Sequence, residues 1–140
     1  MPAERLELDT ALGHFTRVLF DTCGLIDEFK QPSGRLRAIN MGQRATSVVA
    51  VWEFLHIKRG ALLPEAECRD RRIWLGEQEI LPLSLSAAAV TLFENFLETE
   101  GPSSVADAFI AAQCLSDRIP IVTSNVRDFK DVGGLRYVAW

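Results

Sequence analysis

The stretch Val18-Leu19-Phe20-Asp21-Thr22 places an acidic residue directly after three consecutive apolar ones. A short run of β-branched and aromatic residues is typical of a buried strand. Asp21 therefore stands at the carboxyl end of that strand, next to apolar surface. An ionised carboxylate in such a place is costly unless it is paired or binds a metal. Asp21 is thus either the cap of the helix that follows or part of a functional site.

The rest of the chain alternates short apolar segments with amphipathic ones. Strands that alternate with helices predict an α/β fold with a central, mostly parallel sheet of four or five strands, flanked by helices. Pro82 indicates an edge position for the strand that contains it, because proline cannot donate a ladder hydrogen bond. Besides residues 18–20, we expect strands within residues 46–49, 80–85, 119–123 and 136–138.

The length of 140 residues fits one domain. We expect a domain over residues 17–140, preceded by an N-terminal extension over residues 1–16 that the α/β pattern does not need. No apolar run reaches the ~20 residues of a membrane span, and the first ten residues lack the apolar core of a signal peptide. We therefore expect a cytoplasmic protein that makes no contact with membranes.

Three further acidic residues occupy positions like that of Asp21. Glu53 is the only charge in an apolar segment, Asp107 opens another such segment, and Asp128 follows a predicted strand. Ligands of open α/β sheets bind beyond the carboxyl ends of the strands, so these carboxylates are expected to converge there. Structural roles remain open for two of them, because Asp107 also fits a capping box with Ser104 and Asp128 fits a turn. Glu53 has no evident solvent face, which favours a role as a ligand.

The residue types favour a hard cation at such a site. Carboxylate oxygens suit Mg²⁺ or Mn²⁺ rather than zinc, and the three cysteines and two histidines lack the spacing of a zinc site. Several carboxylates around Mg²⁺ are typical of phosphodiester hydrolysis, because the metal lowers the pKa of a bound water and offsets charge on the phosphate. We expect Asp21, Glu53 and Asp107 to share one cation, with Asn125 or Asp128 at the rim.

The formal net charge of −4 argues against broad, non-specific binding of nucleic acid. Basic residues nevertheless cluster along the chain, and we interpret these clusters as solvated faces. They are Arg35, Arg37 and Arg44; Lys58 and Arg59; and Arg69, Arg71 and Arg72.

Four segments together resemble PIN-domain ribonucleases, of the kind found as VapC-like toxins in bacterial toxin–antitoxin pairs. The resemblance runs from about residue 17 to residue 140. Each segment alone has little specificity, but their order and spacing are fairly specific. The segments are residues 18–22 (VLFDT), 46–53 (TSVVAVWE), 106–112 (ADAFIAA) and 122–129 (VTSNVRDF), the last followed by residues 134–136 (GLR).

The resemblance implies a catalytic site for Mg²⁺ or Mn²⁺. The family's metal ligands match Asp21, Glu53 and Asp107 in this sequence. A fourth acid of the family falls near Asn125 or Asp128, and we take Asp128 as the fourth metal-binding and catalytic residue.

Small polar residues near the family's site match positions in this chain, which implies that they position the substrate. Cys23 departs from the pattern, because many members have Asn there and a thiol cannot replace the hydrogen bonds of an amide. Neither histidine has a local motif that would pair it with Cys23, which argues against a thiol nucleophile. The substrate-positioning residues are Thr22, Ser47, Thr123 and Asn125.

The implied function is that of a metal-dependent endoribonuclease that acts on RNA, forms a homodimer and is silenced by a cognate antitoxin protein. One alternative is a non-catalytic PIN-like binding or scaffold module. Another is a receiver-type phosphoacceptor domain, which would require adjacent acids after the first strand and a lysine where Asn125 stands.

A surface for the antitoxin is expected on two neighbouring helices, because their apolar residues exceed what one small core face requires. The other interpretation, that these residues all belong to the core, is equally compatible with the sequence. They are Trp52, Leu55, Leu62, Leu63, Ile73 and Trp74.

Overall fold

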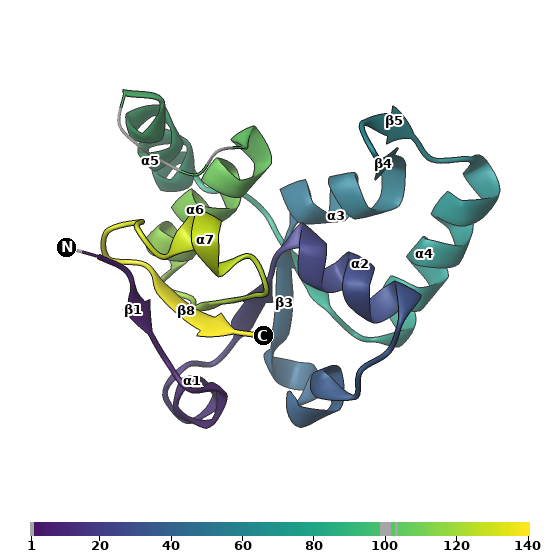
Figure 1. Cartoon of the computed structure of the whole chain (residues 1–140), viewed down its shortest axis with the longest axis horizontal. Coiled ribbons are helices and arrows are strands. Elements are labelled where there is room, and N and C mark those ends of the chain that lie inside the picture. Colours follow the sequence, from purple (N-terminus) through teal and green to yellow (C-terminus); the bar gives the residue numbers. More distant parts are fainter. Residues whose placement is uncertain (1, 99–101, 103) are drawn as a thin grey trace.

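The computed structural model describes residues 2–98, 102 and 104–140. They form one parallel sheet with helices on both sides, which confirms the predicted α/β class (Figure 1). The strands of this sheet are β1 (Glu4–Arg5), β2 (Val18–Phe20), β3 (Arg44–Ser47), β6 (Leu81–Leu83), β7 (Ile121–Thr123) and β8 (Arg136–Ala139).

The strand order is β1-β8-β7-β2-β3-β6, and every neighbouring pair is parallel. All three residues of β2 are buried, as expected for a central strand of a parallel sheet that helices cover on both faces. Phe20 is level with Thr46 of β3 and with Val122 of β7. The carboxyl ends of these three strands therefore meet at one edge of the sheet.

The helices fall into two groups. In Figure 1, α2, α3 and α4 lie on the right of the molecule and α5, α6 and α7 on the left, while α2 packs on α3, α3 on α4 and α5 on α6. No helix in the described part of the chain is long and apolar enough to span a bilayer. The helices are α1 (Leu8–His14), α2 (Thr22–Lys30), α3 (Val48–His56), α4 (Glu65–Glu77), α5 (Ala87–Glu98), α6 (Val105–Asp117) and α7 (Val126–Phe129), with short 3₁₀ helices at Arg35–Ala38 and Met41–Gln43.

The sheet has six strands rather than the four or five expected. The additional strand is β1, which pairs in parallel with β8 and brings the N-terminal segment beside the C-terminal strand (Figure 1). Both of its residues are exposed, so it has no apolar pattern from which a strand can be predicted. At the opposite edge, β6 contains Pro82, as predicted for an edge strand.

A small hairpin follows α3, although the apolar residues Trp52, Leu55 and Ile57 in the sequence predict a helix that ends near Gly60. The helix instead ends at His56, and β4 (Ile57–Lys58) pairs antiparallel with β5 (Ala61–Leu62). The two turn residues, Arg59 and Gly60, both have positive φ angles, 52° and 78°. Two-residue hairpin turns commonly require this left-handed backbone.

Two residues of the basic clusters are buried, so the interpretation of these clusters as solvated faces is wrong for Arg44 and Arg71. The guanidinium of Arg44 donates hydrogen bonds to the carbonyls of Leu36, Ile39 and Gln78 at 2.7, 3.0 and 2.9 Å. Arg44 thus ties the start of β3 to the end of α4 and to the first 3₁₀ helix. Backbone carbonyls satisfy the buried donors of this charge.

Candidate active site

The candidate site lies where the direction of strand addition reverses. From β2 the sheet extends through β3 and β6 on one side, and through β7 and β8 on the other. In open α/β sheets, ligands bind beyond the carboxyl ends of the strands at such a switch point. Asp21 follows β2 and Thr123 ends β7, so both residues lie at this point.

Asp21 is a buried carboxylate that is 1% exposed. Its Oδ1 accepts a hydrogen bond from the Gly24 backbone N–H at 2.9 Å, so it caps α2, and its Oδ2 accepts one from Thr123 Oγ1 at 2.5 Å. A Cβ atom on Gly24 would lie 3.2 Å from Oδ1, so the close approach favours glycine there. Burial raises the pKa of Asp21 above its usual value, although both hydrogen bonds oppose this shift. The cap role that the sequence left open is therefore real.

Glu53 projects from α3 toward the start of α2. Its Oε1 accepts a hydrogen bond from Thr22 Oγ1 at 2.6 Å. Thr22 is buried and Glu53 is partly exposed, although the sequence pattern gave it no solvent face. Thr22 therefore holds the Glu53 carboxylate beside the residue that follows Asp21 in the chain.

Asp107 lies in the first turn of α6, where Ser104 Oγ accepts a hydrogen bond from its backbone N–H at 3.0 Å. Burial and the negative charges of Asp21, Asp128 and Glu53 together raise the pKa of Asp107 from 3.8 to about 6, whereas a hydrogen bond to Ser104 opposes the shift. The three other acids, which belong to α2, α3 and α7 or their caps, are thus the charges that act on Asp107. Acids with raised pKa values, here Asp21 and Asp107, are a common mark of a functional site.

Asn125 and Asp128 flank the same site beyond β7. Asn125 Nδ2 donates to Asp128 Oδ2 at 2.8 Å, and the Asn125 backbone N–H donates to Thr123 Oγ1 at 2.9 Å. Thr123 thereby links this segment directly to Asp21. Asn125 and Asp128, the two positions near which the family's fourth acid falls, are thus hydrogen-bonded to each other.

Ser47 and Cys23 complete the predicted neighbourhood. Ser47 is fully buried at the end of β3, and its Oγ accepts a hydrogen bond from the Val49 backbone N–H at 3.2 Å, which caps α3. Cys23 is exposed, but partial desolvation of its thiol and the negative charges of Asp21, Asp107, Asp27 and Glu53 raise its pKa to about 11. The thiol stays protonated at neutral pH, which agrees with the inference that it is no nucleophile.

Three acids of this site have no basic partner among the residues that the structure describes. Within the part of the chain that the structure describes, no ion pair involves Asp21, Glu53 or Asp107. In the same part, no three side chains of Asp, Glu, His or Cys are placed closely enough to hold a metal ion as they stand. The donor chemistry, with carboxylates beside hydroxyl and amide oxygens, fits a hydrated hard cation such as Mg²⁺, which usually keeps several of its waters. The sharing of one cation stays a prediction.

A basic pocket of about 250 Å³ adjoins Glu53, and no pattern in the sequence connects its residues with the acids. The pocket joins the acidic site at Thr22 and Glu53, which line it together with Ile26 and Ile57. The only available signal was the clustering of basic residues along the chain. Its basic lining residues are Lys30, Lys58, Arg59 and Arg71.

The apolar residues expected at a partner surface divide between surface and core. Trp52, Leu62 and Ile73 are 56%, 78% and 55% exposed, whereas Leu55 is buried and Leu63 and Trp74 are partly buried. Trp52 also lines an apolar groove of about 570 Å³ between α3 and α6. The interpretation that all six residues belong to the core is therefore wrong.

Comparison with known proteins agrees with this architecture. A search of curated proteins finds no match, but several solved structures share the fold at identities of 24% or less. A DNA-bound VapBC from Salmonella typhimurium matches with a TM-score of 0.73 at 20% identity, over 90% of this chain and 100% of the other. VapBC2 from Rickettsia felis, bound to a DNA fragment from its promoter, matches with a TM-score of 0.71 at 17% identity, over 88% of this chain and 98% of the other. A toxin–antitoxin complex from Klebsiella pneumoniae matches with a TM-score of 0.62 at 24% identity, over 84% of this chain and 94% of the other.

The family comparison covers most of the chain. The PIN domain matches residues 18–135, a range that runs from the first residue of β2 to the residue before β8 and contains all four candidate acids. The resemblance seen in the sequence is thereby confirmed, and nothing supports the receiver-type alternative. The chain belongs to the PIN-domain family.

Proposed function

We propose that this protein is a metal-dependent endoribonuclease that serves as the toxin of a toxin–antitoxin pair in the cytoplasm. The observation that carries the proposal is the buried carboxylate of Asp21 at the switch point of a parallel sheet, together with Asp107, whose pKa is raised to about 6 by burial and by the charges of Asp21, Asp128 and Glu53. Like charges repel when no cation is present, so a divalent cation would relieve the repulsion. Membership of the PIN-domain family supports a nuclease role.

In this proposal Asp21, Glu53, Asp107 and Asp128 hold Mg²⁺ or Mn²⁺, directly or through water. When bound, the cation lowers the pKa of a water ligand and neutralises charge on the phosphate. The protein's own contribution is orientation of the acids: Thr123 fixes the Asp21 carboxylate and Thr22 fixes that of Glu53.

The remaining polar residues are proposed to position the RNA. Asn125 presents its side-chain amide beside Asp128, Ser47 sets the start of α3, and Thr22 and Thr123 border the acids. None of these groups has a charge that would compete with the metal for the phosphate. Cys23 stands among the acids as a neutral thiol that can pack against substrate but offers only a weak hydrogen bond.

An antitoxin protein and a second copy of the chain are the proposed protein partners. The support is twofold: the solved structures that share the fold include a toxin–antitoxin complex, and Trp52, Leu62 and Ile73 are large apolar side chains left exposed. Exposed aromatic and aliphatic side chains of this size commonly mark interaction sites.

The test of the nuclease proposal is cleavage of single-stranded RNA by the purified chain. We expect cleavage with Mg²⁺ or Mn²⁺, none with EDTA, and 5′-phosphate ends on the products. Asp21→Asn should abolish cleavage, whereas Asp131→Asn, which removes an exposed acid elsewhere, should leave it unchanged. If the unmodified chain binds RNA but does not cleave it with either metal, the alternative of a non-catalytic PIN-like binding module holds instead.

A further inference from the structure

The basic pocket beside Glu53 contains a buried cation without a counter-charge. Arg71 is 3% exposed, and no ion pair involves it among the residues that the structure describes. In the same part of the chain its Nε atom has no hydrogen-bond partner. Buried charges are ordinarily paired, because a lone one carries the full cost of desolvation. Arg71 therefore favours an anion in the pocket that it lines.

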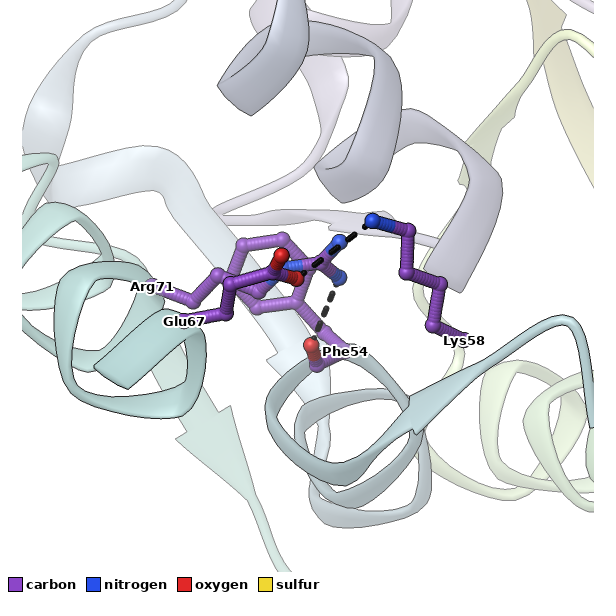
Figure 2. A network of polar contacts seen from close by, with 4 residues as sticks. All are labelled: Phe54, Lys58, Glu67 and Arg71. Carbon is purple, nitrogen blue, oxygen red and sulfur yellow. Dashed lines mark hydrogen bonds and ion pairs between the residues drawn. The ribbon is translucent and has the colours of Figure 1, made fainter. Parts of the chain in front are cut away.

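The guanidinium of Arg71 is held in place by its surroundings. Nη1 donates a hydrogen bond to the Phe54 carbonyl at 2.8 Å, and the guanidinium carbon lies 5.0 and 5.3 Å from the ring centroids of Phe54 and Phe29. Figure 2 shows the Arg71 guanidinium beside the Phe54 ring, between α4 and α3. A positive charge fixed by an aromatic pair is already ordered, so little conformational entropy is lost when an anion binds.

Three more cations line the pocket from different elements. Lys30 ends α2, Lys58 belongs to β4, and Arg59 occupies the turn of the hairpin. Lys58 Nζ lies 3.5 Å from Glu67 Oε2 (Figure 2), but the two side chains are 42% and 44% exposed. Such an exposed, long ion pair contributes little, so Lys58 can turn toward a ligand. The pocket is thus a positive site in a chain of net charge −4.

The position of the pocket identifies the anion. Thr22 and Glu53 line it, and both also belong to the proposed nuclease site. An RNA strand whose scissile phosphate lies at the acids would carry a neighbouring phosphate past this shared wall. We propose that the pocket formed by Lys30, Lys58, Arg59 and Arg71 binds a backbone phosphate of the RNA next to the one that is cleaved. This proposal rests on the nuclease function above and adds to it a subsite for the substrate.

The test compares two pairs of substitutions in the full chain. Lys58→Gln with Arg59→Asn removes two pocket cations, and asparagine tolerates the positive φ of the turn. Arg37→Gln with Arg69→Gln removes the same charge from exposed positions outside the pocket. Both pairs are placed in an Asp107→Asn background with EDTA, so that a fluorescein-labelled single-stranded RNA binds without being cleaved. Fluorescence anisotropy is then measured over a series of salt concentrations.

We expect the pocket pair to weaken RNA binding several-fold and to reduce the slope of log affinity against log salt by about 0.7 to 1.4, the value for one or two lost phosphate contacts on a single strand. The control pair should keep the slope of the background chain. Equal slopes for both pairs would overturn the proposal. A second result would also overturn it: a glutamate-rich peptide binds the background chain but not the pocket pair, while both bind RNA equally well. The pocket would then be a site for an acidic protein segment.

The fate of the nuclease proposal is measured separately, in the chain with all four acids intact. If the unmodified chain cleaves RNA and the pocket pair changes neither kcat nor KM, the phosphate subsite alone is refuted. Conversely, the unmodified chain could fail to cleave RNA with Mg²⁺ and Mn²⁺ while the pocket pair still weakens RNA binding. That result refutes the nuclease proposal and leaves the phosphate-binding pocket standing.

Discussion

Replacing Asp107 by Asn tests whether the acidic cluster is arranged for a cation at the expense of stability. The pKa of this carboxyl rises from 3.8 to about 6, and each unit corresponds to about 1.4 kcal/mol. The upper limit of the penalty on the ionised form is therefore about 3 kcal/mol, and solvent screening of this partly exposed group reduces it to about half. Asparagine also forfeits about 0.3–1 kcal/mol of favourable interaction with the α6 dipole. The expected net gain in the free energy of unfolding is about 0.5–1 kcal/mol without metal.

The sign of the pH dependence follows from the direction of the shift. Because the folded-state pKa exceeds the unfolded one, ionisation of Asp107 penalises the folded state. The penalty is fully present above the folded pKa of about 6 and vanishes below the unfolded value of 3.8. Asp107→Asn should therefore be more stable than the unmodified chain at about pH 7.5, and the difference should fall toward zero as the pH approaches about 4.

The assay is urea unfolding, followed by circular dichroism, in EDTA and again with Mn²⁺. Asp70→Asn serves as the control, because Asp70 is an exposed acid on α4. Mn²⁺ should stabilise the unmodified chain and the control more than Asp107→Asn, since the cation binds the folded carboxylates. If Asp107→Asn unfolds more easily than the unmodified chain in EDTA at about pH 7.5, the carboxylate is a structural cap and the reasoning is refuted.

Three other substitutions test separate parts of the account. Thr123→Val removes the hydroxyl that donates a hydrogen bond to Asp21, so it should lower the free energy of unfolding by about 1–2 kcal/mol and abolish most of the RNA cleavage. Thr123→Ser should retain both stability and cleavage. An active, fully stable valine variant would show that the hydroxyl does not orient the acid. Thr22→Val should lower kcat for RNA cleavage with little change in KM, because Thr22 orients Glu53; a change in KM alone would assign Thr22 to substrate binding. Trp52→Ser replaces a side chain that is 56% exposed, so the free energy of unfolding of the monomer should change by no more than about 0.5 kcal/mol. The same substitution should weaken self-association in analytical ultracentrifugation. An unchanged association constant would exclude this face from a homodimer.

The sequence by itself determined the class of the fold and most of its elements. Residues 18–20 are all apolar and residues 121–123 are all β-branched, which is typical of strands that are buried on both faces. Ser104 caps its helix as expected from local hydrogen bonding of serine to the following N–H groups. Signals of this kind act within a few residues, so they can be recognised in one short window of sequence.

The same local signals left the role of each acid open. The sequence pattern of Asp21 fits a helix cap and a ligand equally well, and the structure shows that its carboxylate caps α2 while its charge also raises the pKa of Asp107. Its second oxygen accepts a hydrogen bond from Thr123, which is 102 positions away. No window of sequence contains both partners, so only the strand order, which places β7 beside β2, decides this contact.

Tertiary structure alone decided which charges are internal and which strands are added at the edges. Arg44 and Arg71 resemble their exposed neighbours in sequence, but packing buries them against carbonyls and aromatic rings contributed by other elements. The strand β1 forms because β8 offers it an edge with unpaired backbone groups, and backbone pairing requires no side-chain pattern. The pocket beside Glu53 arises in the same way, since its four cations come from α2, the β4–β5 hairpin and α4 and meet only when these elements pack together.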